Sequence, residues 1–283
     1  MPRMRLGSDQ DSSNVEDRRG EARGGRRGPG IRLGLGGVLV VAALSVVTKR
    51  NLFVELGLVN GPAPVTRGDD PSRRAREEAS RATAVAAFND AQREWHGILG
   101  DRYSDAKLVL FWDETRSPCG AAGAEMGPFY CPGDQKVYID LGFYEELKSR
   151  FGAPGDFAQA YVIAHEVGHH VQRLLGAEAY VRKLQREHPS EVNALSVRLE
   201  LQADCYAGVW AHSAQSRKLL DPGDLEEGLG AAAAVGDDRI QKMAGRRVSP
   251  ESWTHGSAAM RTKWFKTGFE AGKLEACDTF GAG

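Results

Sequence analysis

The sequence predicts an α+β fold that is mostly helical, with a small sheet, after an N-terminal tail and a single transmembrane helix. Residues 159–175 carry apolar side chains at the i, i+3, i+4, i+7 spacing of a helix with one buried face. Two short runs rich in aliphatic and aromatic residues, 107–112 and 136–141, are typical of strands. The third observation is an uncharged apolar core within residues 31–50, which predicts the membrane helix.

Residues 1–30 are expected to form a disordered basic tail in the cytoplasm. This stretch is rich in Arg, Gly, Asp and Ser and offers almost no apolar side chain to bury. Such a tail can bind RNA or anionic lipid, but a solvated tail is the simpler interpretation. The formal net charge of the whole chain is −1, so no global electrostatic argument predicts a nucleic-acid partner, and none is expected.

Residues 31–50 are expected to be a transmembrane signal anchor. Eight Lys and Arg residues precede the uncharged core, residues 33–48, and three follow within about 20 residues, so the positive-inside rule places the N-terminus in the cytoplasm. We therefore expect a single-pass protein of the inner (cytoplasmic) membrane whose folded domain is extracytoplasmic. A cleaved signal peptide is the alternative, although its charged region would be long, and a buried soluble helix is a third interpretation.

Residues 51–76 are rich in Pro, Gly, Asp and Arg and are expected to be a linker. About 200 residues remain, 77–283, which is ample for one well-buried core. Helices are predicted at 77–99, where apolar residues recur at near-helical spacing, and at 142–151. Residues 137–140 are our candidate for a sheet edge that binds an extended peptide, with an ordinary core strand as an equal alternative.

The helix at 159–175 contains His165, Glu166 and His169 in the pattern H-E-x-x-H. Residues four apart on a helix lie about 6 Å apart along the axis and about 40° apart around it, so both imidazoles face one ion. In zinc peptidases with this spacing the Glu is the general base and not a ligand. We therefore predict Zn²⁺ as the cofactor, His165 and His169 as ligands and Glu166 as the base. The pattern also arises by chance, but most accidental matches lack a third ligand.

A second predicted helix, residues 190–214, offers that third ligand. It carries Glu200 and Asp204, four residues apart and on one face. A catalytic zinc with two histidines and one carboxylate keeps a fourth position open for water, and a ligating histidine usually donates its other ring N–H to a carboxylate. We predict Glu200 as the ligand and Asp204 as the partner of His165 or His169. This acidic spacing is common on solvated helices, but here apolar residues flank it, where unpaired carboxylates are rare.

A loop near the C-terminus offers one more candidate catalytic residue. Peptide hydrolysis passes through a tetrahedral oxyanion, which a hydrogen-bond donor stabilises. His255, within Thr254-His255-Gly256, or the nearby Arg261 is the expected donor. A lone histidine in a Gly-flanked loop is more often structural or exposed, which is the alternative.

The four cysteines permit three pairings, and the sequence alone does not choose among them. If the domain is extracytoplasmic, the simplest expectation is that Cys119 bonds to Cys131 and Cys205 bonds to Cys277. Four buried thiols are the alternative. A cysteine-based zinc site is less favoured, because no C-x-x-C pair occurs.

Several stretches resemble the bacterial neutral zinc metallopeptidase family, whose members are membrane-anchored proteins with an HExxH domain. The resemblance runs from about Ser13 to Phe280, nearly the whole chain. It implies a zincin-type peptidase fold with Glu as third ligand, in which a small sheet lies beside the active-site helix, but it implies no particular substrate. The stretches that carry it are NVEDRR at 14–19, GPFYCP at 127–132, VYIDLGFY at 137–144, HEVGHH at 165–170, ELQADC at 200–205, and Thr254-His255-Gly256 with the Arg and Trp-Phe that follow.

Together these features predict a membrane-anchored, zinc-dependent metallopeptidase that hydrolyses peptide bonds in a peptide or protein substrate. A zinc-activated water would attack, with Glu166 as general base. The alternative is a non-catalytic, zinc-containing scaffold or binding module at the membrane, because the same ligands would hold a structural zinc. A zinc hydrolase acting on a non-peptide bond would share the site as well. No pattern in the sequence predicts the cleavage preference or the oligomeric state.

Overall fold

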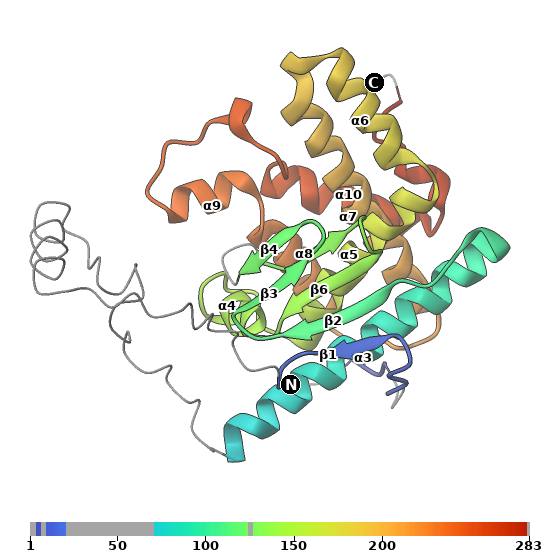
Figure 1. The fold of residues 1–283 in the computed structure, drawn as a ribbon, viewed down its shortest axis with the longest axis vertical. Helices are drawn as coiled ribbons and strands as arrows, with labels where there is room; N and C mark the ends of the chain where they lie inside the picture. Colours follow the sequence, from blue (N-terminus) through green and yellow to red (C-terminus); the bar gives the residue numbers. More distant parts are fainter. Residues whose placement is uncertain (1–3, 7–9, 21–70, 124–126, 282–283) are drawn as a thin grey trace, which may run out of the picture. The chain divides into compact units, whose positions relative to one another are not determined.

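The computed structural model describes residues 4–6, 10–20, 71–123 and 127–281. Their fold is α+β and mostly helical with a small sheet, as predicted (Figure 1). In chain order the elements are β1 (Val15–Asp17), α3 (Pro71–Leu99), β2 (Lys107–Phe111), β3 (Glu114–Ser117), β4 (Gly120–Gly123), β5 (Phe129–Cys131), β6 (Lys136–Asp140), α4 (Gly142–Ser149), α5 (Asp156–Leu174), α6 (Ala177–Glu187), α7 (Val192–Ser216), α8 (Asp224–Ala234), α9 (Asp237–Met243) and α10 (Ala258–Ala271).

The main sheet has four strands in the order β1-β2-β6-β5. β1 and β6 run parallel to β2, and β5 runs antiparallel to β6, while β3 and β4 form a separate hairpin. Because β6 lies between β2 and β5, the prediction that residues 137–140 form a substrate-binding edge is wrong. The alternative of a core strand is confirmed, and the side chains of β6 beyond Lys136 are buried.

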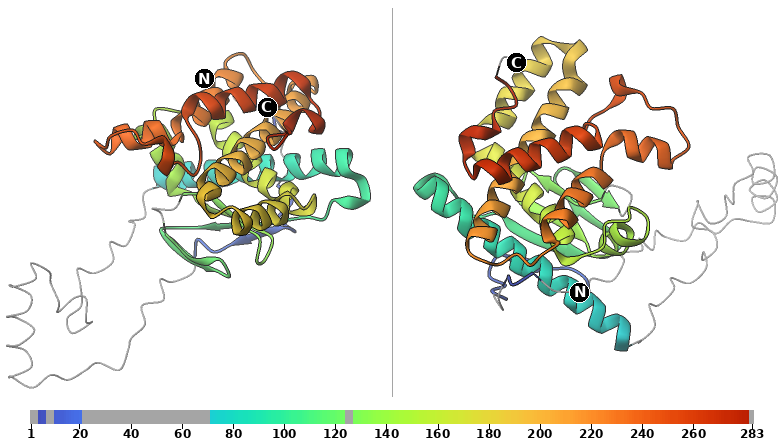
Figure 2. Two further views of the ribbon diagram at one scale, coloured as in Figure 1. Left: turned by 90° about the horizontal axis from the view of Figure 1, so that it is seen from above. Right: turned by 180° about the vertical axis from the view of Figure 1, so that it is seen from behind.

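The helices that carry the predicted site residues pack together on the sheet. α5 contacts β5, β6, α7 and α8, and α7 also packs along α10 (Figure 2). The buried core between them contains large side chains such as Trp95, Trp210, Phe157 and Phe265. The predicted end of the first site helix is confirmed, because Gly176 takes the left-handed conformation, φ 80°, directly after its last turn.

Two glycines allow α7 and α10 to approach each other closely. A Cβ at Gly208 would lie 2.1 Å from the backbone oxygen of Phe265, and one at Gly268 would lie 1.9 Å from that of Cys205. A residue with a side chain at either position would therefore force the two helices apart. The close packing holds α10 beside the part of α7 that carries Glu200 and Asp204.

The predicted disorder of residues 1–30 is wrong for the part that the structure describes, residues 4–6 and 10–20. Residues 15–17 form β1 in the main sheet, and Met4 and Leu6 are each 8% exposed in the core. These residues form one compact unit with residues 77–283. The polar composition of this segment predicted disorder. Its few apolar side chains are nevertheless buried in the domain, and its backbone pairs with a strand that lies much later in the chain.

The predicted transmembrane segment, residues 31–50, lies outside the described residues, as do residues 21–30 and 51–70. Within the described ranges, no helix combines the length and the apolar character needed to cross a bilayer. Helix α3 begins at Pro71, so residues 71–76 are helical where a linker was expected.

Both expected disulfide pairs are confirmed. Cys119, in the turn between β3 and β4, is bonded to Cys131 of β5. Cys205 of α7 is bonded to Cys277 near the C-terminus. The first bond fastens the hairpin to the sheet, and the second fastens the C-terminal segment to a helix of the predicted site.

Candidate metal centre

Helix α5 presents His165 and His169 towards α7. Most of the helix is buried, and His165 itself is 6% exposed. Gly168, between the two histidines, lies against α7, where an added Cβ would sit 3.0 Å from the backbone oxygen of Ala203 and 3.2 Å from its Cα. The glycine therefore lets the two helices approach closely enough for a carboxylate of α7 to reach both imidazoles.

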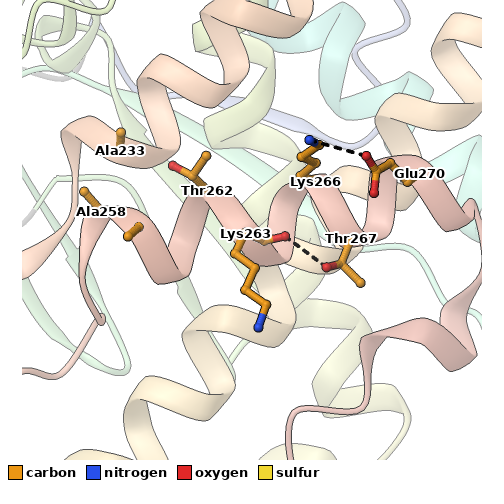
Figure 3. A pocket seen from close by; sticks show the side chains of 8 residues that line it. Ala233, Ala258, Thr262, Lys263, Lys266, Thr267 and Glu270 are labelled. Atoms are coloured by element: carbon orange, nitrogen blue, oxygen red, sulfur yellow. Dashed lines mark hydrogen bonds and ion pairs between the residues drawn. The ribbon is translucent and has the colours of Figure 1, made fainter.

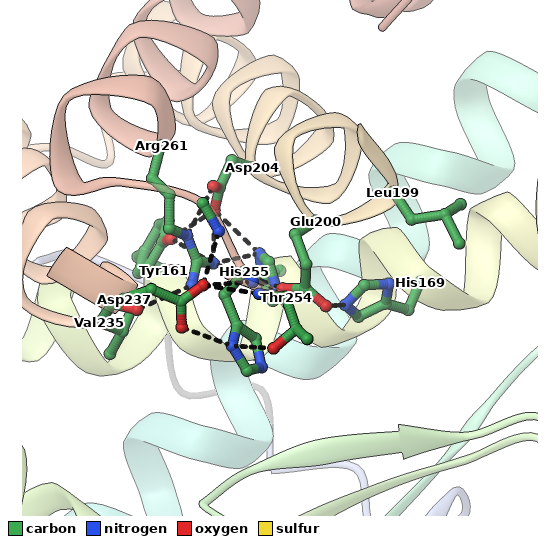
Figure 4. A network of polar contacts seen from close by, with 12 residues as sticks. Tyr161, His169, Leu199, Glu200, Asp204, Val235, Asp237, Thr254, His255 and Arg261 are labelled. Atoms are coloured by element: carbon green, nitrogen blue, oxygen red, sulfur yellow. Dashed lines mark hydrogen bonds and ion pairs between the residues drawn. The ribbon is translucent and has the colours of Figure 1, made fainter. Parts of the chain in front are cut away.

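Glu200 of α7 is that carboxylate (Figure 4). Its Oε2 lies 3.3 Å from Nε2 of His165, and its Oε1 lies 3.5 Å from Nε2 of His169. Donor atoms of all three side chains lie within 4.8 Å of one another. A tetrahedral zinc with bonds of about 2.0–2.1 Å holds its donor atoms about 3.4 Å apart. The three residues predicted as ligands thus converge, and their spacing fits a zinc ion.

The electrostatics of this group favour a cation. Burial by itself would lower the pKa of His165, but Asp204 and Glu200 outweigh it and raise that pKa to about 9. Burial would likewise raise the pKa of Glu200, but His169 and His165 hold it well below its usual range. The neighbouring carboxylates therefore favour a positive charge on or beside these imidazoles.

Asp204, four residues beyond Glu200, holds the outer nitrogen of His165. Its Oδ1 lies 2.9 Å from Nδ1 of that ring, and Tyr161 donates a hydrogen bond to the same oxygen. Arg261 of α10 donates from Nε to Oδ2 at 2.8 Å and from Nη2 to Oδ1 at 2.9 Å. Burial would raise the pKa of Asp204, but Arg261 and His165 lower it, so the carboxylate is charged. Arg261, one expected oxyanion donor, is instead buried and bound to this carboxylate.

The partner of His169 is Gln172, which the sequence reasoning missed. Its Oε1 lies 2.8 Å from Nδ1 of His169, and its Nε2 donates to the backbone oxygen of Leu199 at 2.7 Å and to Oε1 of Gln202 at 3.1 Å. Because both amide hydrogens have acceptors, Oε1 faces the ring, Nδ1 carries the proton, and Nε2 is free to bind a metal. The available signal was its position, three residues after His169 on the same helix face.

Glu166 lies beside the ligands and is 6% exposed. Burial raises the pKa of its carboxyl group, and the two neighbouring histidines oppose that shift. A carboxylate in such an environment accepts a proton more readily than one in water.

His255 lies on the loop before α10, half-exposed beside the predicted ligands (Figure 4). Its Nδ1 is 3.1 Å from Oδ1 of Asp237, and Oδ2 of Asp237 accepts the backbone N–H groups of residues 254, 255 and 256. Asp237 raises the pKa of His255, burial opposes this, and the charge of Glu200 adds to it. The loop is thus organised around Asp237, whose role the sequence did not indicate.

His170, which follows His169, points away from the ligands. Its Nδ1 accepts from the hydroxyl of Tyr130 at 2.9 Å, and its Nε2 lies 2.6 Å from the backbone oxygen of Ser104. Burial lowers its pKa, which favours the neutral ring. His170 therefore fastens α5 to β5 and is not one of the converging donors.

An open pocket of about 730 Å³ is lined by residues of α8 and α10 (Figure 3). Its lining includes Ala233, Ala258 and Thr262, together with Lys266, which pairs with Glu270 at 3.5 Å. None of the predicted site residues lines it, so it is separate from the candidate metal centre.

Comparisons with known proteins identify the family. Residues 4–280 match the family described as "Putative neutral zinc metallopeptidase". The chain is 48% identical over 289 residues to the uncharacterized protein YpfJ of Escherichia coli (strain K12), covering 98% of this chain and 99% of that one. It is 44% identical over 209 residues to the uncharacterized protein Rv2575 of Mycobacterium tuberculosis (strain H37Rv), covering 70% of each chain. No solved structure matches. The predicted resemblance is confirmed, and the chain belongs to the neutral zinc metallopeptidase family described above.

Proposed function

We propose that this protein is a zinc-dependent metallopeptidase that hydrolyses peptide bonds in peptide or protein substrates. The observation that carries the proposal is the convergence of His165, His169 and Glu200, with donor atoms within 4.8 Å of one another and Glu166 adjacent. A zinc ion held by these residues would supply a Lewis acid able to polarise a carbonyl group and to lower the pKa of a water molecule.

The protein's own side chains would then transfer the proton, orient the imidazoles and stabilise the oxyanion. Glu166 takes a proton from the attacking water and delivers it to the leaving amine. Asp204 and Gln172 keep the two imidazoles oriented with Nε2 towards the ligand group. His255, held by Asp237, donates a hydrogen bond to the oxyanion that develops on the carbonyl.

A non-catalytic zinc scaffold is the competing function, and two features of the site favour an enzyme over it. Structural zinc sites are closed by four protein ligands, whereas the group found among the described residues offers three, so a zinc held there would keep a position for water or substrate. The side chains of His169 and Glu200 are also about one-fifth exposed, so solvent reaches this group of residues.

The substitution Glu166→Gln tests this function. It removes the base and keeps the side-chain size, so kcat on a generic protein substrate such as casein should fall about 10²–10⁴-fold. Zinc content should match the wild type, because Glu166 is not a ligand. Glu187→Gln, an exposed change on α6, is the matched control and should retain activity.

Zinc removal distinguishes the proposed enzyme from a non-catalytic zinc scaffold. A chelator should abolish casein cleavage by the full chain, and added zinc should restore it. Full activity of a pure Glu166→Gln sample would contradict the assignment of the base. A zinc-loaded wild type without hydrolysis of any peptide would favour the scaffold.

A further inference from the structure

The described residues before position 21 are built into the same sheet as the domain that follows residue 76. Val15, Glu16 and Asp17 of β1 lie opposite Leu108, Val109 and Leu110 of β2. The pairing continues at both ends, where the backbone N–H of Leu108 donates to Asn14 and that of Arg18 donates to Leu110, each at 2.8 Å. β1 is therefore a regular outer strand, and β2 is an inner strand only because β1 is present.

Side-chain ion pairs hold this strand in register. Oε1 of Glu16 lies 2.6 Å from Nζ of Lys136 on β6, two strands away, and both side chains are partly buried. Burial would raise the pKa of Glu16, but Lys136 and Arg18 lower it, so the carboxylate is charged. Asp17 pairs in the same way with Arg81 of α3 at 3.3 Å.

The first described residues reach the beginning of the active-site helix. The backbone N–H of Met4 donates to Oδ2 of Asp156, the first residue of α5, at 2.9 Å. The backbone N–H of Arg5 donates to Leu219 at 2.8 Å, and its side chain pairs with Asp221 at 3.0 Å. Together with β1, these contacts join the N-terminal segment to the sheet and to α5.

This arrangement conflicts with the membrane topology predicted from the sequence. A single crossing by residues 31–50 would put β1 in the cytoplasm and β2 on the other side. Paired strands lie about 4.8 Å apart, whereas the hydrocarbon core of a bilayer is about 30 Å thick. Cleavage of a signal peptide after the apolar stretch would remove β1 altogether.

The two disulfides indicate which side holds the domain. Cys119–Cys131 and Cys205–Cys277 account for all four cysteines of the chain. Such bonds form and persist in oxidising compartments outside the cytoplasm. We propose that the segment before residue 21 and the domain after residue 76 share one compartment, outside the cytoplasm, and that the mature chain keeps β1. This proposal does not depend on peptidase activity.

Epitope tags at the two ends of the full chain test the shared compartment. In intact bacterial spheroplasts, external protease should digest both tags without detergent, while a cytoplasmic marker protein stays protected. Protection of the N-terminal tag alone would restore the single-pass topology and overturn the proposal. Protection of both tags until detergent is added, or absence of the N-terminal tag from the mature protein, would overturn it as well.

Chemical cross-linking tests the docking of β1 directly. A carbodiimide activates the Glu16 carboxylate, the Lys136 amine attacks it, and the reagent leaves as a urea, so a new amide joins the two strands. Mass spectrometry of the purified full chain should find this amide in the wild type and lose it in Glu16→Gln.

Two internal controls make a negative result decisive. Lys266 and Glu270, 3.5 Å apart within α10, should cross-link in every variant. Glu78→Gln changes an exposed carboxylate of α3 and should leave the Glu16–Lys136 link intact. Absence of that link in a wild type that forms the α10 link would overturn the docking of β1.

Discussion

The two imidazoles of the candidate centre are oriented by chemically different partners. Nδ1 of His165 faces the charged carboxylate of Asp204, whereas Nδ1 of His169 faces the neutral amide of Gln172. Asp204 forms a hydrogen-bonded ion pair with Arg261, and the side-chain amide of Gln172 donates hydrogen bonds to Leu199 and Gln202. Each ring is therefore fixed by a residue that is itself held in place, which pre-organises the ligand group.

Removal of the amide should weaken metal binding without breaking the ligand set. We expect Gln172→Ala to lower zinc affinity about 10–100-fold, because Nδ1 of His169 loses the acceptor that fixes its tautomer. Competition with a chromogenic chelator measures this change. Gln185→Ala, which removes an amide of α6 bonded to Ser196, is the control. Equal zinc affinity of Gln172→Ala and the wild type would show that the amide does not orient the ring.

At the scale of elements, the site depends on close contact between helices. Gly168 lies where α5 meets α7, and Gly208 and Gly268 lie where α7 meets α10. These contacts bring Glu200 to the histidines and Arg261 to Asp204. The glycines therefore contribute to the site by allowing close helix packing and not by contacting a ligand.

The substitution Gly268→Ala tests this close packing. Its Cβ would lie 1.9 Å from the backbone oxygen of Cys205, so α10 must shift, and we expect the free energy of unfolding to fall by about 1–3 kcal/mol. Urea denaturation measures the loss. Gly230→Ala on α8 is the matched control, because a Cβ there meets nothing within 4 Å, and added helix propensity should make it neutral or slightly stabilising. Equal effects of the two substitutions would contradict the packing argument.

Local sequence patterns predicted the elements whose signals lie within one segment. The repeating apolar positions of α5, the spacing of His165 and His169, and Glu200 on the next long helix are all of this kind. Features formed by distant residues were not predictable in the same way. β1 is only three residues long and depends on a strand more than 90 residues later. Asp237 lies 18 positions before His255 in the chain, and no sequence periodicity links the two.

At the scale of the whole molecule, the predicted metal ligands come from two helices that belong to the central packing. His165 and His169 are on α5, which contacts the sheet, and Glu200 is on α7, which contacts α10. A ligand that binds only the folded state raises the free energy of unfolding, by about 2.7 kcal/mol at a concentration 100 times its Kd. An ion bound by all three side chains would join α5 to α7, so this stabilisation should extend to the whole cooperatively folding domain.

Metal removal should therefore lower the stability of the entire domain and not merely that of the site. We expect a chelator to reduce the free energy of unfolding of the wild type by about 2–3 kcal/mol relative to buffer with zinc at 100 times the Kd. Circular dichroism and tryptophan fluorescence should report the same shift, because Trp95 and Trp210 are buried in the core. His165→Ala should show no chelator-dependent shift, whereas His188→Ala, an exposed change at the end of α6, should respond like the wild type. An ion that binds these three side chains only in the folded protein must raise the free energy of unfolding. If zinc leaves the unfolding of the wild type unchanged, the three side chains therefore do not bind it.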